Sequence, residues 1–244
     1  VPQTLLFAAG DLGRKNITLT ENNAWRDVRV RMTYPAVGAP LAIGCSTDNF
    51  AIRPASLDVA ASDQDWQTAG IARALNNSGY PGGTVHKAGQ PFTLTVTGNN
   101  ALSAVTTNYN GNPLANVVGF VLPVLGACPT CLLSAGAFVG AGGTVVSNTA
   151  TYSEVGAFQL QMSDDTFAAV DAGDGSSVAE RTAYSTITSV GRFVPDHFTL
   201  TSGTLTAACM AGAPPFSYMN QPFQNLTANV EAQNASGVAT VNYH

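Results

Sequence analysis

One stretch of the sequence occurs twice, and this repetition constrains the fold more than any other feature. Residues 90–109 read QPFTLTVTGNNALSAVTTNY, and residues 221–243 read QPFQNLTANVEAQNASGVATVNY. In both copies an Asn-Ala pair is followed, at one fixed spacing, by Thr, Asn and Tyr. An internal repeat of this kind predicts one structural unit that the chain uses more than once.

The similarity extends upstream, to segments that begin at Pro54 in the first copy and at Pro195 in the second. The two prolines lie 141 residues apart, whereas Asn108 and Asn242 lie 134 residues apart. One copy therefore occupies about 140 residues, which is the size of an ordinary domain.

Apolar and polar residues alternate in several short segments between turn signals. Alternation is clear in residues 17–20 (ITLT), 28–34 (VRVRMTY), 92–97 (FTLTVT) and 158–162 (FQLQM). Such a period of two is typical of half-buried strands. Residues 63–77 instead suggest a short helix or an elaborated loop. The sequence as a whole predicts an all-β fold of tandem immunoglobulin-like antiparallel β-sandwiches.

The repeat divides the chain into three parts. Residues 1–49 are expected to be the closing strands of a preceding unit, because VRVRM resembles the later FQLQM. Residues 50–192 are expected to form one complete sandwich. Residues 193–244 are expected to open a second copy, which is incomplete within this chain.

The opening half of a sandwich cannot cover its own apolar face, and it leaves an open strand edge. Three solutions follow from the sequence. The polypeptide continues past His244, or residues 1–49 fold back, or another molecule supplies a strand as in donor-strand complementation. The third solution would produce a head-to-tail fibre.

No Asp, Glu, Lys or Arg occurs between Lys87 and Glu154. The apolar part, residues 117–143, is long enough to span a membrane as a helix. Pro123, Pro129 and the glycine-rich end disfavour that helix, so we expect no membrane-spanning segment. Residues 114–147 are then either core strands or an apolar surface that a partner covers.

The charge of the chain argues against one class of partner. Charged residues make up 10% of the sequence and the net charge is −5. The sequence has no cluster of Lys and Arg that would bind a phosphate backbone, so we expect no nucleic-acid binding.

The four cysteines are interpreted as structural. A redox role for Cys128 and Cys131 would need a helix N-terminus in a βαβ setting, but the surroundings are strands and loops. We therefore expect a disulfide across this tight loop. A zinc site would need further ligands that the three histidines do not offer. Cys45 and Cys209 would then pair with each other, or one of them with a cysteine outside this chain.

Sites of chemistry are few. The weak calcium candidates are Asp164, Asp165, Asp171 and Asp174. Their spacing does not match an EF-hand loop, and no other cofactor is expected. Asp196-His197 lacks a G-x-S-x-G nucleophile motif. We therefore expect no catalytic residues and a protein that is not an enzyme.

Four blocks of sequence, in one order, carry a family resemblance. They are residues 45–54 (CSTDNFAIRP), 152–156 (YSEVG), 191–198 (GRFVPDHF) and 216–223 (FSYMNQPF). These blocks resemble MshQ-type proteins of mannose-sensitive haemagglutinin (MSHA) type IV pilus biogenesis loci in Gram-negative bacteria. The resemblance implies an extracellular or cell-surface protein tied to pilus biogenesis or adhesion, and it implies no catalytic residues.

Two functional hypotheses follow. The first is a structural stalk or fibre module whose partners are other copies of itself or pilus and surface proteins. The alternative is an adhesin-type module that recognises glycan or protein through loops at one end of the sandwich. Trp66, Tyr80 and Tyr109 would be the contact residues of that alternative, although each also suits a core.

Overall fold

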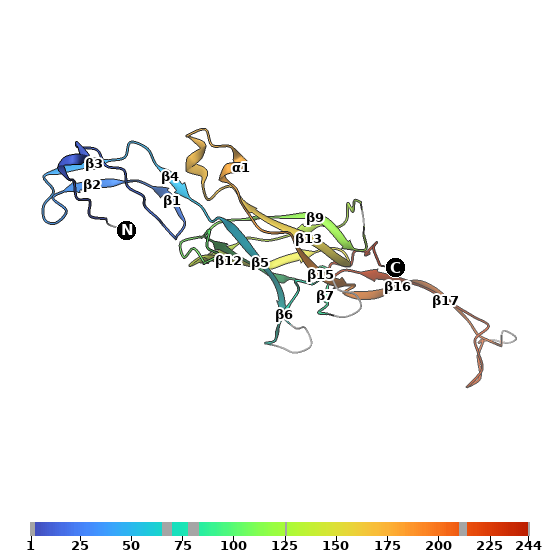
Figure 1. The fold of residues 1–244 in the computed structure, drawn as a ribbon. Coiled ribbons are helices and arrows are strands. Elements are labelled where there is room, and N and C mark those ends of the chain that lie inside the picture. The colour runs from blue at the N-terminus through green and yellow to red at the C-terminus, as the bar shows by residue number, and fades with distance from the viewer. Residues whose placement is uncertain (1–2, 65–69, 78–82, 125, 210–213, 244) are drawn as a thin grey trace.

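The structure is a computed structural model of the chain, and it describes all residues except 1–2, 65–69, 78–82, 125, 210–213 and 244. The fold is all-β, as predicted, and α1 (Val178–Arg181) is a single short helix turn. The elements lie in a row, with an N-terminal hairpin at one end, a sandwich in the middle and a C-terminal hairpin at the other end (Figure 1).

The strands have the following bounds. The N-terminal ones are β1 (Trp25–Val28), β2 (Arg31–Tyr34), β3 (Ala42–Cys45) and β4 (Phe50–Ile52). The central ones are β5 (Ser56–Gln64), β6 (Ala72–Ala74), β7 (His86–Lys87), β8 (Phe92–Asn99), β9 (Leu114–Leu122), β10 (Leu133–Ser134), β11 (Val139–Ala141), β12 (Thr144–Tyr152), β13 (Gly156–Asp164), β14 (Ala183–Tyr184) and β15 (Thr188–Val194). The C-terminal ones are β16 (His197–Thr206) and β17 (Asn225–Gln233).

Two sheets form the central sandwich. One has the order β10-β12-β8-β5-β6, with β11 also paired to β12. In the other, β13 lies between β9 and β15, and β7 joins the far side of β15 in parallel. An immunoglobulin sandwich places strands A, B, E and D in one sheet and C, F and G in the other. Strands β5, β8, β12 and β10 hold the first set of positions, and β9, β13 and β15 hold the second.

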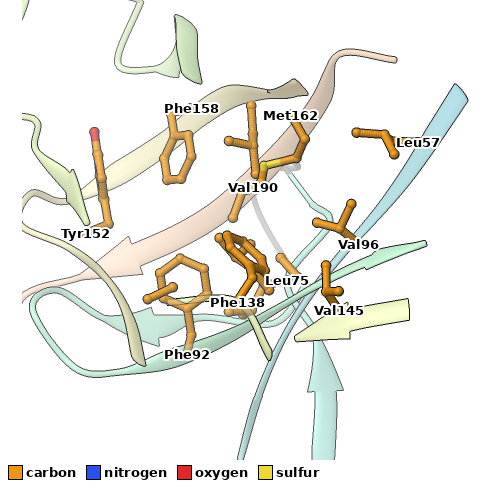
Figure 2. Close-up of a cluster of buried hydrophobic side chains, with 14 of the residues drawn as sticks. Leu57, Leu75, Phe92, Val96, Phe138, Val145, Tyr152, Phe158, Met162 and Val190 are labelled. Atoms are coloured by element: carbon orange, nitrogen blue, oxygen red, sulfur yellow. The ribbon is translucent and has the colours of Figure 1, made fainter. Parts of the chain in front are cut away.

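The core lies between these sheets. Phe92 and Val96 of β8 face Phe158 and Met162 of β13, and all four side chains are buried (Figure 2). The intervening threonines of β8 are only half-buried, so the alternation in residues 92–97 indicated the correct face. Burial of each large apolar side chain contributes about 1.5–3 kcal/mol.

The charge-free stretch between Lys87 and Glu154 supplies strands β8 to β12. Its inner face belongs to the core, where Val145 is buried and Val117 and Phe120 pack against the cluster. Its outer face is exposed, with Leu114 and Val118 open to solvent. Among the residues described, no helix is both long and apolar enough to cross a membrane.

The N-terminal strands form one interrupted hairpin. Strand β1 pairs with β4, and β2 pairs with β3, both antiparallel. The predicted strand at 28–34 is therefore split in two. The predicted strand at 17–20 does not form, because no neighbouring segment in the described structure bonds to its backbone.

No helix forms in the described part of residues 63–77, so the helix alternative was wrong there. Strand β5 continues through Gln64, and β6 returns antiparallel to it, with Asp63 opposite Arg73. Trp66 lies outside the described residues.

The two copies of the repeat pair in the same way. Ser56 lies opposite Asn99 in the β5–β8 pair, and His197 lies opposite Gln233 in the β16–β17 pair. The Gln-Pro-Phe motif does not follow this register, because Phe92 begins β8 whereas Phe223 precedes β17.

The division of the chain at residues 49 and 192 remains a prediction. Strand pairing adds that β4, just after residue 49, pairs with β1 of the N-terminal hairpin. Strand β15 continues past residue 192 to Val194.

Candidate functional site

A tight turn follows β8, and Asn100 organises it. The Asn100 side-chain oxygen accepts hydrogen bonds from the backbone N–H of Leu102 (2.9 Å) and Ala104 (3.1 Å). The backbone N–H and the hydroxyl of Thr106 both donate to the Gly98 carbonyl, at 2.9 and 3.1 Å. Asparagine suits this role, because its side chain bonds the backbone two residues on.

The turn after β17 repeats these bonds. The Asn234 side-chain oxygen accepts from Ser236 (3.0 Å) and Val238 (3.1 Å), and Thr240 donates twice to the Ala232 carbonyl. The left-handed position of the turn is Ser103 in the first copy and Gly237 in the second. The repeated Asn and Thr therefore build the same local structure twice.

Each turn also contacts the segment before its own unit. The side-chain amide of Asn100 donates to the Asn22 carbonyl at 3.3 Å. The backbone N–H and hydroxyl of Thr107 donate to the side-chain oxygen of Asn23, at 3.2 and 2.8 Å. These bonds form the first junction, between residues 22–24 and the central sandwich.

The second junction has the same construction. The side-chain amide of Asn234 donates to the Ser153 carbonyl at 3.0 Å. The backbone N–H groups of Val241 and Asn242 donate to the carboxylate of Glu154, at 3.2 and 3.4 Å. Glu154 thus replaces Asn23, and this carboxylate is buried. A buried carboxylate needs hydrogen-bond donors. The backbone N–H groups of the turn after β17 supply them for Glu154.

The disulfide lies at the second junction. Cys128 and Cys131 are bonded, as the sequence analysis predicted. The side-chain amide of Asn242 lies 3.4 Å from the Cys128 sulfur and 3.2 Å from the Cys131 sulfur. The disulfide loop therefore forms part of the surface on which the C-terminal hairpin rests.

The expected pairing of Cys45 with Cys209 was wrong. Both thiols are free. Cys45 ends β3 and Cys209 follows β16, and these hairpins lie at opposite ends of the molecule (Figure 1). A disulfide requires Cα atoms within about 7 Å of each other. A bond to a cysteine outside this chain stays a prediction.

Arg26 adds a further contact to the first junction. Its guanidinium donates to the side chain and the carbonyl of Asn110, at 3.2 and 3.1 Å, and to the Thr166 carbonyl. The same group lies 4.5 Å from the centre of the Phe167 ring. Such cation–π contacts contribute about 0.5–1 kcal/mol at exposed sites.

Two of the four aspartates proposed for calcium, Asp164 and Asp171, accept hydrogen bonds from protein groups. Asp164 is buried and accepts hydrogen bonds from Tyr109, Thr166 and Phe167. Burial, and then the charge and the hydrogen bond of Asp164, raise the pKa of the Tyr109 phenol.

Asp171 accepts a bond from the Ala51 N–H at 2.8 Å, so this carboxylate ties β4 to the central unit. Asp165 and Asp174 are the other two calcium candidates. No group of three or more His, Cys, Asp or Glu side chains in the described part of the chain could hold a metal ion.

Asp196-His197 belongs to the second junction. The Asp196 carboxylate accepts from the Gln90 amide at 3.0 Å, contacts His197 Nδ1 at 2.9 Å and pairs with Lys87 at 3.6 Å. The other ring nitrogen of His197 contacts the Gln233 side chain at 3.0 Å. The hydrogen bond from Gln90, followed by those of His197 and the nearby positive charges, lowers the Asp196 pKa.

We expect acid to weaken this junction. Because the pKa of Asp196 is lower in the folded chain than in the unfolded one, its stabilisation is present above about pH 4 and is lost as the pH falls through the folded pKa. The Asp196→Asn variant should therefore show a flatter dependence of Tm on pH below about pH 4. Thermal unfolding across that range tests this, and two parallel profiles would contradict it.

A buried charged network was missed by the sequence analysis. Asp63 on β5 accepts from Arg73 Nε at 3.0 Å and Nη2 at 2.6 Å, and it contacts His86 Nδ1 at 2.8 Å. The Asp63 side chain is fully buried. The one available signal was a charged residue at an inward position of a strand whose preceding inward residues, Leu57, Val59 and Ala61, are apolar.

The first junction encloses a small hollow of about 190 Å³. It is lined by Glu21, Asn22, Asn23, Ile52, Arg53, Ala55, Asn100, Ala101 and Thr106. Pockets for drug-sized ligands measure about 300–1,000 Å³, so the hollow does not argue for a small-molecule site.

Of the three aromatic residues of the adhesin hypothesis, the structure describes Tyr109. Tyr109 is fully buried in the core, which excludes it as a contact residue. Trp66 and Tyr80 lie outside the described residues.

The described chain is of the all-β class, with one immunoglobulin-like β-sandwich and a β-hairpin joined to it at each end. Residues 154–244 match the model of the third domain of DUF6701, an uncharacterised family. The match covers less than half of the chain, and it spans β13, β15 and the C-terminal hairpin. No curated protein and no solved structure matches this sequence.

Proposed function

We propose that this chain is a non-enzymatic structural module of a bacterial surface protein, in which immunoglobulin-like units are joined end to end as a stalk or fibre. The observation that carries this proposal is the repeated junction. An enzyme has no need for the same contact at both ends of one domain, whereas a stalk needs it at every step.

The connectors between the units favour a stiff arrangement. Arg53-Pro54 and Val194-Pro195 join the parts, and each proline fixes its own backbone φ. Pro54 is buried, and the Arg53 guanidinium donates to the Glu180 carbonyl at 2.9 Å. Long Gly/Ser linkers would behave as flexible coils, and these connectors have neither the length nor the composition.

The surface location and the association with pili rest on the sequence resemblance to MshQ-type proteins. A disulfide in a chain with two lysines supports an exported protein, because disulfides persist in oxidising compartments. The match to a domain described as the third of its family supports a chain with several domains in series.

The test is the shape of the purified chain in solution. Small-angle X-ray scattering should give an extended, narrowly distributed shape for the native sequence. The double variant Asn100→Ala with Asn234→Ala removes the anchor of both junctions, and each lost hydrogen bond costs about 0.5–1.5 kcal/mol. We expect a broader distribution of shapes for this variant.

The matched control is Asn148→Ala. Asn148 is exposed on β12, and its side-chain oxygen accepts a hydrogen bond from the Thr93 hydroxyl at 3.0 Å. The control should scatter like the native chain. A native chain that is already as variable in shape as the double variant would refute a stiff stalk. A glycan array addresses the adhesin alternative, and specific glycan binding by the native chain would favour it.

A further inference from the structure

Five polar side chains meet at the base of the C-terminal hairpin, with Gln233 at their centre. The Gln233 side-chain oxygen accepts a hydrogen bond from the Thr199 hydroxyl at 2.8 Å and contacts His197 Nε2 at 3.0 Å. The Gln233 side-chain nitrogen donates to the Glu231 carboxylate at 2.6 Å. The Asp196 carboxylate contacts the other ring nitrogen of His197 at 2.9 Å. A hydroxyl, an amide, an imidazole and two carboxylates thus share one place.

The repeat does not require this cluster. The register of the two strand pairs aligns β16–β17 with β5–β8, and the equivalent positions of the central unit hold Ala55, Ser56, Asp58, Thr97 and Asn99. In the central unit the Asn99 amide donates to the Asp58 carboxylate at 2.6 Å. A carboxylate there takes the place of the Thr199 hydroxyl, so fastening such a hairpin needs neither a nucleophile nor an imidazole.

The Thr199 hydroxyl lies close to the carbon of the Gln233 amide. A C=O bond is about 1.23 Å long, so an oxygen that lies 2.8 Å from the amide oxygen is at most about 4 Å from the amide carbon. Reacting atoms that are well placed for attack are about 3–3.5 Å apart. A hydroxyl is a weak nucleophile until a base takes its proton, so the reaction also needs a group that moves this proton.

Glu231 is placed to move the proton. It lies directly opposite Thr199 in the register of β16 and β17, and opposite residues of an antiparallel pair have Cβ atoms about 4.5–5.5 Å apart. The Glu231 carboxylate also lies 2.6 Å from the Gln233 side-chain nitrogen, which is within hydrogen-bond reach for proton transfer. One carboxylate can therefore take the proton from the hydroxyl and deliver it to the nitrogen.

His197 faces the oxygen on which negative charge develops when a nucleophile adds to the amide. A ring that is protonated at both nitrogens donates to Asp196 through Nδ1 and to the Gln233 oxygen through Nε2. A donor at that oxygen stabilises the tetrahedral intermediate, and loss of one such donor slows acyl transfer about 100-fold or more. Asp196, which also accepts from Gln90 at 3.0 Å, holds the ring in this orientation.

We propose that the Thr199 hydroxyl attacks the Gln233 side-chain amide and forms an intramolecular ester that ties β16 to β17. The bond between Thr199 Oγ1 and Gln233 Cδ forms, and the bond between Cδ and Nε2 breaks. The hydroxyl proton passes through Glu231 to the nitrogen, which leaves as ammonia. No oxidant, reductant or further reactant takes part. Each chain reacts once, so the reaction is a self-modification and not the turnover of a substrate.

The mass of the purified 244-residue chain tests the ester. Mass spectrometry of the intact, unfolded chain should give the sequence mass, corrected for the disulfide, less one ammonia. A digest should contain one linked pair of peptides that joins Thr199 to Gln233, and mild alkali, which hydrolyses esters faster than amides, should separate the pair. Thr199→Val should have the full mass. Thr199→Ser keeps a hydroxyl and should lose ammonia as the native chain does.

Two further variants complete the test. Thr201→Val is the matched control, because Thr201 is an exposed threonine of the same strand whose hydroxyl donates to the Asn229 carbonyl at 3.2 Å, and it should lose ammonia. Glu231→Gln should slow the loss of ammonia at least about 100-fold. A native chain with the full mass, or a Thr199→Val variant that still loses one ammonia, would overturn the inference.

The ester goes beyond the proposed stalk function and is tested separately from it. A covalent tie at the base of the hairpin would keep β16 and β17 together when a stalk is pulled, but the mass of the chain does not depend on its shape. Small-angle scattering from Thr199→Val, which retains Asn100 and Asn234, reports the shape of a chain without the ester. Failure of one proposal is therefore distinguishable from failure of the other.

Discussion

Replacement of Asp63 by alanine should lower the free energy of unfolding of the central sandwich by about 3–5 kcal/mol, because it removes one member of a buried charged network. The Asp63 carboxylate bonds Arg73 through two nitrogens and contacts His86 through a third. The exposed fractions of the Asp63 and His86 side chains are 0% and 4%. The substitution therefore takes away a buried negative charge while the half-buried Arg73 guanidinium, which is 22% exposed, stays in place.

The network also explains why this loss should be global rather than local. Asp63 lies near the end of β5, Arg73 lies on β6 and His86 on β7, and β7 belongs to the opposite sheet. The His86 ring contacts Phe92 of one sheet and Phe193 of the other edge-on, with centroids 5.9 and 5.8 Å apart. The carboxylate thus links both layers of the sandwich.

Chemical unfolding, followed by circular dichroism, measures this effect. The matched control is Asp58→Ala on the same strand, where the carboxylate is exposed and bonds Asn99. We expect that control to cost about 0.5–1.5 kcal/mol, the net worth of one hydrogen bond. Equal losses for the two variants would show that burial of the Asp63 network has no special importance.

Replacement of Gly156 by alanine should cost about 3 kcal/mol or more. Gly156 begins β13 with φ +112°, a conformation that residues with a Cβ rarely adopt. An added Cβ would overlap the Leu122 carbonyl oxygen and approach the Pro123 ring. The oxygen belongs to the backbone of the paired strand β9, so it cannot rotate away. Backbone strain and overpacking each cost about 1–3 kcal/mol.

Thermal unfolding measures this second effect, which also tests the second junction. Glu154 and Val155 directly precede Gly156, so a shifted β13 should displace the carboxylate that binds Val241 and Asn242. The control is Gly173→Ala, where φ is −64° and the nearest neighbour of a Cβ is 3.5 Å away. We expect that control to change stability by less than about 0.5 kcal/mol. A Gly156→Ala variant as stable as this control would contradict the overlap.

The strand pattern and the turns were predictable because they depend on residues close together in the chain. Alternation in 92–97 marked the buried face of β8, and the repeated Asn100 and Asn234 marked two turns with the same bonds. The Cys128–Cys131 disulfide was predictable for the same reason, since only two residues lie between the two cysteines.

The junctions were not predictable from either copy of the repeat alone. Asn22 and Ser153 contribute backbone carbonyls, which carry no sequence signal. Asn23 and Glu154 hold equivalent places with different side chains, because the N–H donors that they meet require only an oxygen acceptor. A search for identical residues therefore passes over this pair.

The sequence by itself determined an all-β chain with a recurring unit, because alternation and local turn bonds are encoded within a few residues. Only the tertiary structure decided which apolar faces are covered. Leu57 and Phe198 occupy matching positions in the repeat, yet one is 1% exposed and the other 55%. The physical reason is that burial is supplied by strands far away in the chain, and the same hairpin is covered in one copy and open in the other.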